Sequence, residues 1–171
     1  MGQRAVLGCS LLVPLLALGA ATTPDPWSDV RFLFGDWKMT RGGGTPGEAI
    51  SGGFAFRLEL DGHIAVRRNQ SEYAPKPGEK VGVQHSDLMV LTPTASGLKA
   101  TYWDNEGHVV EYAVKGENGV VTFESDPAAP GPRFKLVYER QSEDELTIAF
   151  SMAQPGGKYQ TYVSGRATRR R

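Results

Sequence analysis

Three short runs rich in β-branched and aromatic residues follow one another between Leu98 and Ser125, and the breaks between them contain asparagine and glycine. Valine, threonine, tyrosine, phenylalanine and tryptophan favour the pleated, half-buried surface of a sheet. The breaks, Asp104–Gly107 and Glu117–Gly119, supply residues that accept the positive φ angles of tight hairpins. This stretch therefore predicts an antiparallel meander of three strands.

The same rhythm continues on both sides of the meander. Apolar and polar residues alternate along Phe54–Leu60, Phe134–Arg140 and Leu146–Met152, which is typical of strands with one buried face. Further strands are predicted at Trp37–Thr40, His63–Tyr73, Gln84–Leu91 and Tyr159–Ala167, after a short helix at Trp27–Phe34. Glycine- and proline-rich connections are predicted at Arg41–Gly47, Ala74–Gly82, Pro93–Gly97 and Asp126–Pro132. The expected total is ten strands in sequential hairpin order.

Ten sequential strands without a long helix between them predict an all-β fold. An open meander would leave exposed strand edges that invite aggregation, so we expect a closed antiparallel up-and-down β-barrel. A β-sandwich is the alternative, but its Greek-key crossovers need longer connections than most of these turns supply. A barrel with this number of strands should be wide enough for a ligand cavity.

The N-terminal residues have the pattern of a secretory signal peptide. Arg4 gives a short basic start, Ala5–Ala21 is almost entirely apolar, and its last three residues are small, as signal peptidase requires. We therefore expect a signal peptide over residues 1–21 and a secreted or periplasmic mature protein. The alternative is an uncleaved membrane anchor, for which the apolar run is short and contains Pro14.

The rest of the chain divides into an extended spacer at 22–26, a barrel domain at 27–168 and a basic tail at 169–171. Cys9, the only cysteine, lies in the expected signal peptide, so the mature domain has neither a disulfide nor a thiol nucleophile. The chain has 19 basic and 19 acidic residues, and no broad positive field indicates a nucleic-acid partner. We expect a solvated tail and no stable membrane insertion after signal cleavage.

The clearest candidate for chemistry is a histidine and an aspartate on one strand. His85 and Asp87 lie two positions apart, so their side chains point to the same face, which Met89 continues toward the expected interior. Such a pair can transfer protons, provide two metal ligands or form a structural hydrogen bond. The candidate ligand-binding residues are His85, Asp87, Met89, Arg68, Tyr102 and Tyr138.

The other two histidines, His63 and His108, follow predicted turns and are expected near solvent. The three histidines lack the spacing of metal ligands, so no metal site is predicted. The sequence also contains no serine nucleophile elbow and no phosphate-binding glycine loop.

The motifs Phe32–Trp37, Tyr102–Gly107 and Pro132–Phe134 make the chain resemble lipocalin-like, calycin-type barrels. More narrowly, it resembles nitrobindin-like barrels and a group of uncharacterised bacterial exported domains. This resemblance implies a barrel with a cavity, and nitrobindin-like proteins bind haem through a histidine late in the barrel, with nitrogen-oxide chemistry. All three histidines of this chain precede the late strands, so no cofactor is predicted.

The sequence thus leads to the expectation of an exported barrel that binds a small, largely apolar molecule. The alternatives are an enzyme that uses the His85–Asp87 pair, a nitrobindin-like haem protein, and an envelope interaction module without a ligand.

Overall fold

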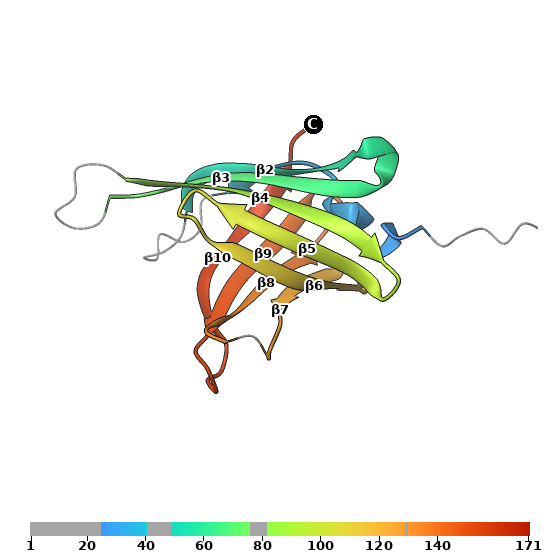
Figure 1. Cartoon of the computed structure of the whole chain (residues 1–171). Helices are drawn as coiled ribbons and strands as arrows, with labels where there is room; N and C mark the ends of the chain where they lie inside the picture. The colour runs from blue at the N-terminus through green and yellow to red at the C-terminus, as the bar shows by residue number, and fades with distance from the viewer. Residues whose placement is uncertain (1–24, 41–48, 76–81, 129) are drawn as a thin grey trace, which may run out of the picture.

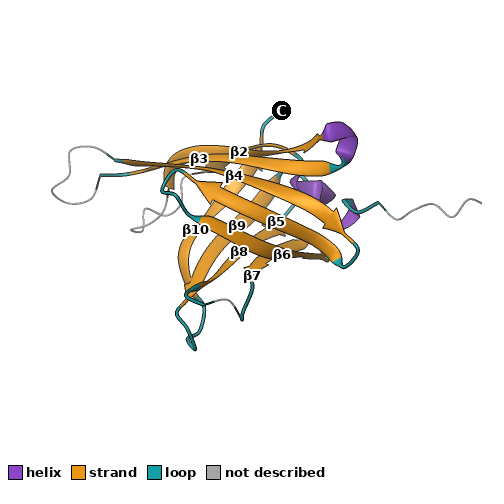
Figure 2. Cartoon of the chain, in the orientation of Figure 1, coloured by secondary structure: helices purple, strands orange, loops and turns teal. Residues whose placement is uncertain are grey.

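A computed structural model describes residues 25–40, 49–75, 82–128 and 130–171 of the chain. Ten antiparallel strands form a closed barrel, in which each strand pairs with its sequence neighbours and β10 returns to β1 (Figures 1 and 2). The elements are η1 (Ser28–Leu33), β1 (Gly35–Thr40), β2 (Ala49–Glu59), η2 (Leu60–Gly62), β3 (Ile64–Tyr73), β4 (Val83–Thr94), β5 (Gly97–Asp104), β6 (Val109–Glu117), β7 (Val120–Ser125), β8 (Arg133–Arg140), β9 (Glu145–Ala153) and β10 (Gln160–Arg169). The predicted all-β, up-and-down barrel is confirmed.

The short N-terminal helix η1 is a 3₁₀-helix, and its sequence explains why. The apolar residues Trp27, Val30 and Leu33 are three positions apart and all buried, which matches the three residues per turn of this helix type. The side chain of Asp25 accepts a hydrogen bond from the backbone N–H of Trp27 at 3.1 Å and fixes the start.

The helix η1 closes one end of the barrel. Trp37, directly after η1, is 1% exposed, and its indole Nε1 donates to the carbonyl of Leu33 at 2.8 Å. The indole of Trp27 donates to the carbonyl of Gly62 at 3.0 Å, which ties η1 to the β2–β3 hairpin. The hairpins β2–β3, β4–β5, β6–β7 and β8–β9 lie at this end, which we call the η1 end. The opposite end, which holds the β5–β6 turn and the β7–β8 connection, is called the far end.

The β2–β3 and β6–β7 hairpins rely on left-handed residues. Asn118 and Gly119 have φ angles of 51° and 79°, the positive values that a tight two-residue hairpin requires. The turn predicted at Asp61–Gly62 is longer than expected, because Leu60 also has a positive φ, of 52°, and joins the turn η2.

Several strands are longer than predicted: β2 begins at Ala49 instead of Phe54, and β4 ends at Thr94 instead of Leu91. Pro93 was expected in a turn but lies within β4, paired with Leu98, and the turn is limited to residues 95–96. The hydroxyl of Thr94 donates to the carbonyl of Gly97 at 2.7 Å and supports this tighter turn.

Arg169 was assigned to the basic tail, but the structure places it in β10, opposite Trp37 of β1. Its guanidinium donates to the carbonyl oxygens of Phe34 at 2.7 Å and Phe32 at 3.1 Å. It also lies 4.2 Å from the ring centroid of Trp37. These contacts hold Arg169 against the helix that closes the barrel.

The expected signal peptide at 1–21 and the connection at Arg41–Gly47 lie outside the described residues, as does most of the connection at Ala74–Gly82. Within the described part of the chain, no helix has both the length and the apolar character that a membrane span needs.

Candidate functional site

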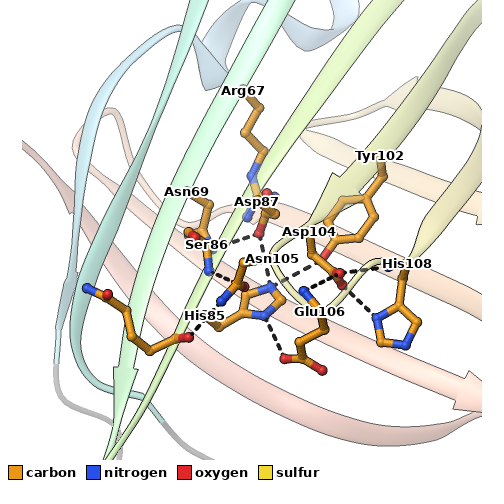
Figure 3. A network of polar contacts seen from close by, with 11 residues as sticks. Arg67, Asn69, His85, Ser86, Asp87, Tyr102, Asp104, Asn105, Glu106 and His108 are labelled. Carbon is orange, nitrogen blue, oxygen red and sulfur yellow. Dashed lines mark hydrogen bonds and ion pairs between the residues drawn. The ribbon is translucent and has the colours of Figure 1, made fainter.

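The register of β3, β4 and β5 brings several polar side chains together inside the barrel. Asn69 of β3 lies opposite Asp87 of β4, which lies opposite Asp104 of β5. Side chains two positions apart on a strand share one face, so the neighbouring inward positions also meet. We call the resulting group the polar cluster (Figure 3), and it consists of Arg67, Asn69, His85, Asp87, Tyr102, Asp104, Glu106 and His108.

The deepest part of the polar cluster is an ion pair between Arg67 and Asp87. The guanidinium Nη1 of Arg67 lies 2.5 Å from Oδ1 of Asp87, and the two side chains are only 7% and 3% exposed. The amide of Asn69 donates to the other oxygen of Asp87 at 2.8 Å. Burial alone would raise the pKa of Asp87, but Arg67, His85 and Asn69 outweigh burial and hold this pKa below its ordinary value. Asp87 is therefore a carboxylate at neutral pH.

His85 connects this ion pair to the far end of the barrel. Its Nε2 lies 3.1 Å from the hydroxyl of Tyr102 and 3.4 Å from Oδ2 of Asp87, and its Nδ1 lies 3.2 Å from Glu106. The hydrogen bond to Asp87 raises the pKa of His85, burial opposes the rise, and Glu106 adds to it. With an acceptor near each ring nitrogen, His85 can donate on both sides when its imidazole is protonated.

The β5–β6 turn supplies the outer part of the polar cluster. Oδ1 of Asp104 accepts hydrogen bonds from the backbone N–H groups of Glu106 and His108, at 3.0 and 2.9 Å. Its Oδ2 lies 2.9 Å from Nδ1 of His108 and accepts from the hydroxyl of Tyr102 at 3.2 Å. Burial would raise the pKa of Asp104, but the hydrogen bonds from His108 and Glu106 lower it overall. Asp104 thus fixes the turn and orients Tyr102.

An apolar wall lies across the barrel interior from the polar cluster. Met39, Phe134, Ile148 and Phe150 share the inward faces of their strands with buried core residues, yet each remains only half-buried. The rings of Phe134 and Phe150 stack with their centroids 6.1 Å apart. Each of these inward-facing side chains therefore keeps some accessible surface.

Five of the six predicted site residues face the interior: His85, Asp87, Met89, Tyr102 and Tyr138. His85, Asp87 and Tyr102 belong to the polar cluster, whereas Met89 and Tyr138 are fully buried in the core. Arg68 lies on the outer face, with its side chain 63% exposed and 3.8 Å from Glu59. The guanidinium that partners Asp87 belongs instead to the preceding residue, Arg67.

Sequence reasoning missed Arg67, Asn69, Asp104 and Glu106, and it assigned no role to His108. Arg67 and Asn69 alternate with the outward Arg68 along β3, but two adjacent arginines give no local signal of which one faces inward. His63 is exposed beside the η2 turn, where it was expected. Among the described residues, no three histidine, cysteine or acidic side chains are grouped in a way that could hold a metal ion.

The arrangement supports binding and proton exchange at a partly buried surface. The polar cluster offers donors from Arg67, His85 and Tyr102 next to fixed carboxylates, and the apolar wall offers surface for a hydrocarbon group. Comparisons of the sequence with models of protein families and with curated proteins find no match for this chain. The fold shown here is a closed ten-stranded antiparallel β-barrel, consistent with a calycin-like barrel.

Proposed function

We propose that this protein is an exported β-barrel that binds a small, largely apolar molecule in its interior. The observation that carries the proposal is the buried Arg67–Asp87 ion pair inside a barrel that also has inward-pointing, half-buried apolar side chains. Small-molecule sites are mostly apolar and contain a few fixed polar groups that orient the ligand. In this proposal the apolar wall holds the body of the molecule, and the polar cluster meets its polar end.

Burying the charges of the polar cluster costs free energy, and contacts with a ligand would offset that cost. Removing charges from water is unfavourable, and a buried ion pair seldom stabilises a fold more than an apolar pair of similar volume. The Arg67–Asp87 pair is nevertheless surrounded by aromatic side chains, with the guanidinium 5.7 Å from the ring centroid of Phe54. A charged pair in such surroundings supports a role in recognition.

A fluorescence titration tests the proposal. The neutral, apolar dye N-phenyl-1-naphthylamine should bind the mature barrel with saturable, one-to-one enhancement of its emission. Ile148 faces the interior, is half-buried and lies opposite Tyr138, so Ile148→Trp should fill the accessible space. We expect this variant to weaken dye binding by at least about tenfold, which corresponds to 1.4 kcal/mol.

The matched control is Ser164→Trp, which adds the same side chain at an exposed position of the neighbouring strand β10. This variant should bind the dye as the unmodified protein does. Equal loss of binding in both variants, or no saturable binding in the unmodified barrel, would count against a site in the interior. Native mass spectrometry of the purified protein would then identify any molecule that already occupies it.

Export is part of the proposal, and it rests on the apolar N-terminal run followed by small residues. We expect cleavage near Ala21 and a cysteine-free mature protein in the periplasm or outside the cell. N-terminal sequencing of the exported protein checks this expectation. A mature chain that still contains Leu11–Leu18 would contradict it.

An enzyme is the second candidate, favoured by the contact of His85 with both Asp87 and the hydroxyl of Tyr102. In that case His85, whose pKa is raised, would act as a general acid by giving a proton to a bound molecule in place of its contact with the Tyr102 hydroxyl. Turnover of a bound molecule that is lost in His85→Gln, while dye binding is kept, would favour the enzyme over simple binding.

A further inference from the structure

An open groove lies at the η1 end of the barrel (Figure 1), between η1 and the ends of β6, β7, β8 and β10. Its volume is about 760 Å³, and sites for small molecules usually measure about 300–1,000 Å³. Five charged side chains contribute to its lining: Asp29, Arg31, Arg140, Glu143 and Arg169. The groove lies at the opposite end of the barrel from the β5–β6 turn, so it is separate from the polar cluster.

The structure holds the side chain of Arg140 in a fixed position on the wall of this groove. Arg140 lies two positions after the buried Tyr138 and therefore points toward the inside of the barrel end. Its guanidinium carbon lies 5.4 Å from the ring centroid of Phe32. Its backbone N–H donates to the carbonyl of Gly119 at 2.8 Å, and a Cβ on Gly119 would lie only 3.4 Å from Nε of Arg140. The guanidinium is thus confined by an aromatic ring and a hairpin.

Arg140 differs from the other two arginines of the groove in its partners. Arg169 donates to backbone carbonyl oxygens at 2.7 and 3.1 Å, and Arg31 forms an ion pair with Asp25. Within residues 25–40, 49–75, 82–128 and 130–171, no group accepts a hydrogen bond from the guanidinium of Arg140. Its planar set of donors therefore stays available to a molecule in the groove.

Two carboxylates of the groove are also available. Asp29 of η1 and Glu143 of the β8–β9 turn are exposed, and in the described part of the chain neither forms an ion pair. One groove thus presents a fixed cation and two anions that do not pair with one another. A molecule that carries both kinds of charge can contact both.

We propose that this groove is a second binding site, which takes a small zwitterion with a carboxylate and an ammonium group, as in a short peptide. The carboxylate of the molecule accepts two hydrogen bonds from the planar guanidinium of Arg140. Its ammonium group donates to the carboxylates of Asp29 and Glu143. This inference goes beyond the proposed function, because it concerns a different site and a different class of molecule.

The mixed charges of the groove disfavour simpler ions. A molecule with only a negative charge would be attracted by Arg140 but repelled by Asp29 and Glu143. A molecule with only a positive charge would meet the opposite balance. Since like charges next to each other oppose binding, the zwitterion matches the groove better than either ion alone.

Three forms of one dipeptide separate these chemistries: alanyl-leucine, N-acetyl-alanyl-leucine without the ammonium group, and alanyl-leucine amide without the carboxylate. Each is titrated into the ¹⁵N-labelled mature protein and followed by two-dimensional NMR. The zwitterion should bind about fivefold more tightly than either blocked form, as expected for an exposed ion pair at each end. The backbone amides of Asn118 and Gly119, in the groove, should shift on binding.

The variant Arg140→Gln removes the cation that the carboxylate needs. It should bind alanyl-leucine no more tightly than wild type binds the amide form. The double variant Asp29→Asn, Glu143→Gln should bind the zwitterion and the N-acetyl form equally, and it gives the test from the ammonium side if Arg140→Gln does not fold.

The matched control is Arg166→Gln, which removes an exposed arginine of β10 that pairs with Glu145 outside the groove. This variant should keep the full preference for the zwitterion. An equal loss of preference in Arg166→Gln and Arg140→Gln would show an effect of net charge and would contradict the assignment of Arg140.

The remaining outcomes separate this inference from the proposed function. Ile148→Trp should leave the binding of alanyl-leucine unchanged, because Ile148 faces the barrel interior. Equal binding of the three peptide forms, or no binding of any of them, overturns the inference while the binding of N-phenyl-1-naphthylamine still tests the proposed function. Tightest binding of the N-acetyl form or of the amide would replace the zwitterion by a simple anion or cation.

Discussion

At the scale of single residues, the Arg67–Asp87 ion pair is the feature on which the interior depends. Both side chains are nearly inaccessible, so each charge relies on the other for compensation. A buried charge that loses its partner has neither water nor a counter-charge, whereas an apolar pair of similar volume needs neither. Replacing one member of the pair should therefore change the free energy of unfolding very differently from replacing both members.

The variant Arg67→Met should lower the free energy of unfolding by about 3–5 kcal/mol, because it leaves Asp87 buried and unpaired. The double variant Arg67→Met, Asp87→Leu should recover much of that loss. Urea denaturation measures both, and Arg68→Met on the exposed outer face is the control, with an expected change within about 0.5 kcal/mol. A double variant no more stable than Arg67→Met alone would speak against this account.

His85 should make stability depend on pH. Its folded-state pKa is raised above the ordinary value near 6.5, chiefly by the hydrogen bond to Asp87, while burial opposes the rise and Glu106 supports it. A raised pKa means that the folded state binds the proton more tightly than the unfolded state. The stabilisation is therefore full below about pH 6.5 and is lost as the pH rises through the folded-state pKa.

The variant His85→Gln should accordingly lower stability most at pH 5.5 and least at pH 9. Urea denaturation of wild type and variant at the two pH values checks this, with His63→Gln at an exposed position as the control. The same loss of stability at both pH values would show that the imidazolium contributes nothing and that only packing was changed.

At the scale of elements, η1 and the first residues of β1 form the closure of the barrel. Trp37 stacks on Phe54 with ring centroids 6.1 Å apart, beneath the guanidinium of Arg169. The helix η1, the strand β1 and the strand β10 thus come together at the indole of Trp37. The N-terminal and C-terminal segments of the barrel domain therefore form the closure together.

Trp37→Ala should destabilise the protein by about 3–5 kcal/mol, as large aromatic truncations in cores do. The control is Trp103→Ala, since the side chain of Trp103 is among the exposed large hydrophobic residues of the surface. Chemical denaturation of both variants measures the difference. Equal small effects at the two positions would refute the role of Trp37 in the closure.

The strand pattern could be predicted from the sequence because alternation is strong along β2, β8 and β9, and Asn118–Gly119 specifies a hairpin. Which residues of β3 face the barrel interior could not be predicted from the sequence. Its first three residues, 64–66, are all apolar, and two arginines follow, so either arginine could face inward. Pairing with the neighbouring strands sets the phase, since Arg67 lies opposite Phe56 of β2 and Met89 of β4.

The same limit explains the other differences. Arg169 resembles the free arginines that follow it, and its fixed position depends on carbonyl oxygens of Phe32 and Phe34 at the opposite end of the domain. Pro93 resembles a turn residue, and its place in β4 depends on pairing with β5. His85 and Asp87 could be found because their spacing is local, whereas Asp104 joins them only through the sheet register.

At the scale of the whole molecule, the closed barrel is consistent with a calycin-like fold, and haem binding tests the nitrobindin-like alternative. Both ring nitrogens of His85 already face acceptors, and the late strands β8 and β10 carry tyrosines instead of histidines. A haem ligand needs a free ring nitrogen that points to the iron. The interior described here does not offer one without breaking the polar cluster.

The mature domain titrated with haemin should therefore give no tight one-to-one complex and no Soret shift typical of histidine ligation. Absorption spectroscopy checks this, and His85→Ala is the companion variant. A stoichiometric complex that forms in wild type and disappears in His85→Ala would restore the nitrobindin-like interpretation ahead of generic ligand binding.

The pairing of β1 with β10 also has a consequence for how the chain reaches its native state. Every other ladder joins consecutive strands, so nine hairpins can form one after another as the chain emerges. The last seam instead joins groups such as Arg169 and Phe34, which lie 135 positions apart. The barrel can close only after the final strand is available, and a chain in transit across a membrane would remain open until then. Joining the two ends and opening the chain at Asn118–Gly119 would turn this seam into a local hairpin and make β6–β7 the new long-range seam.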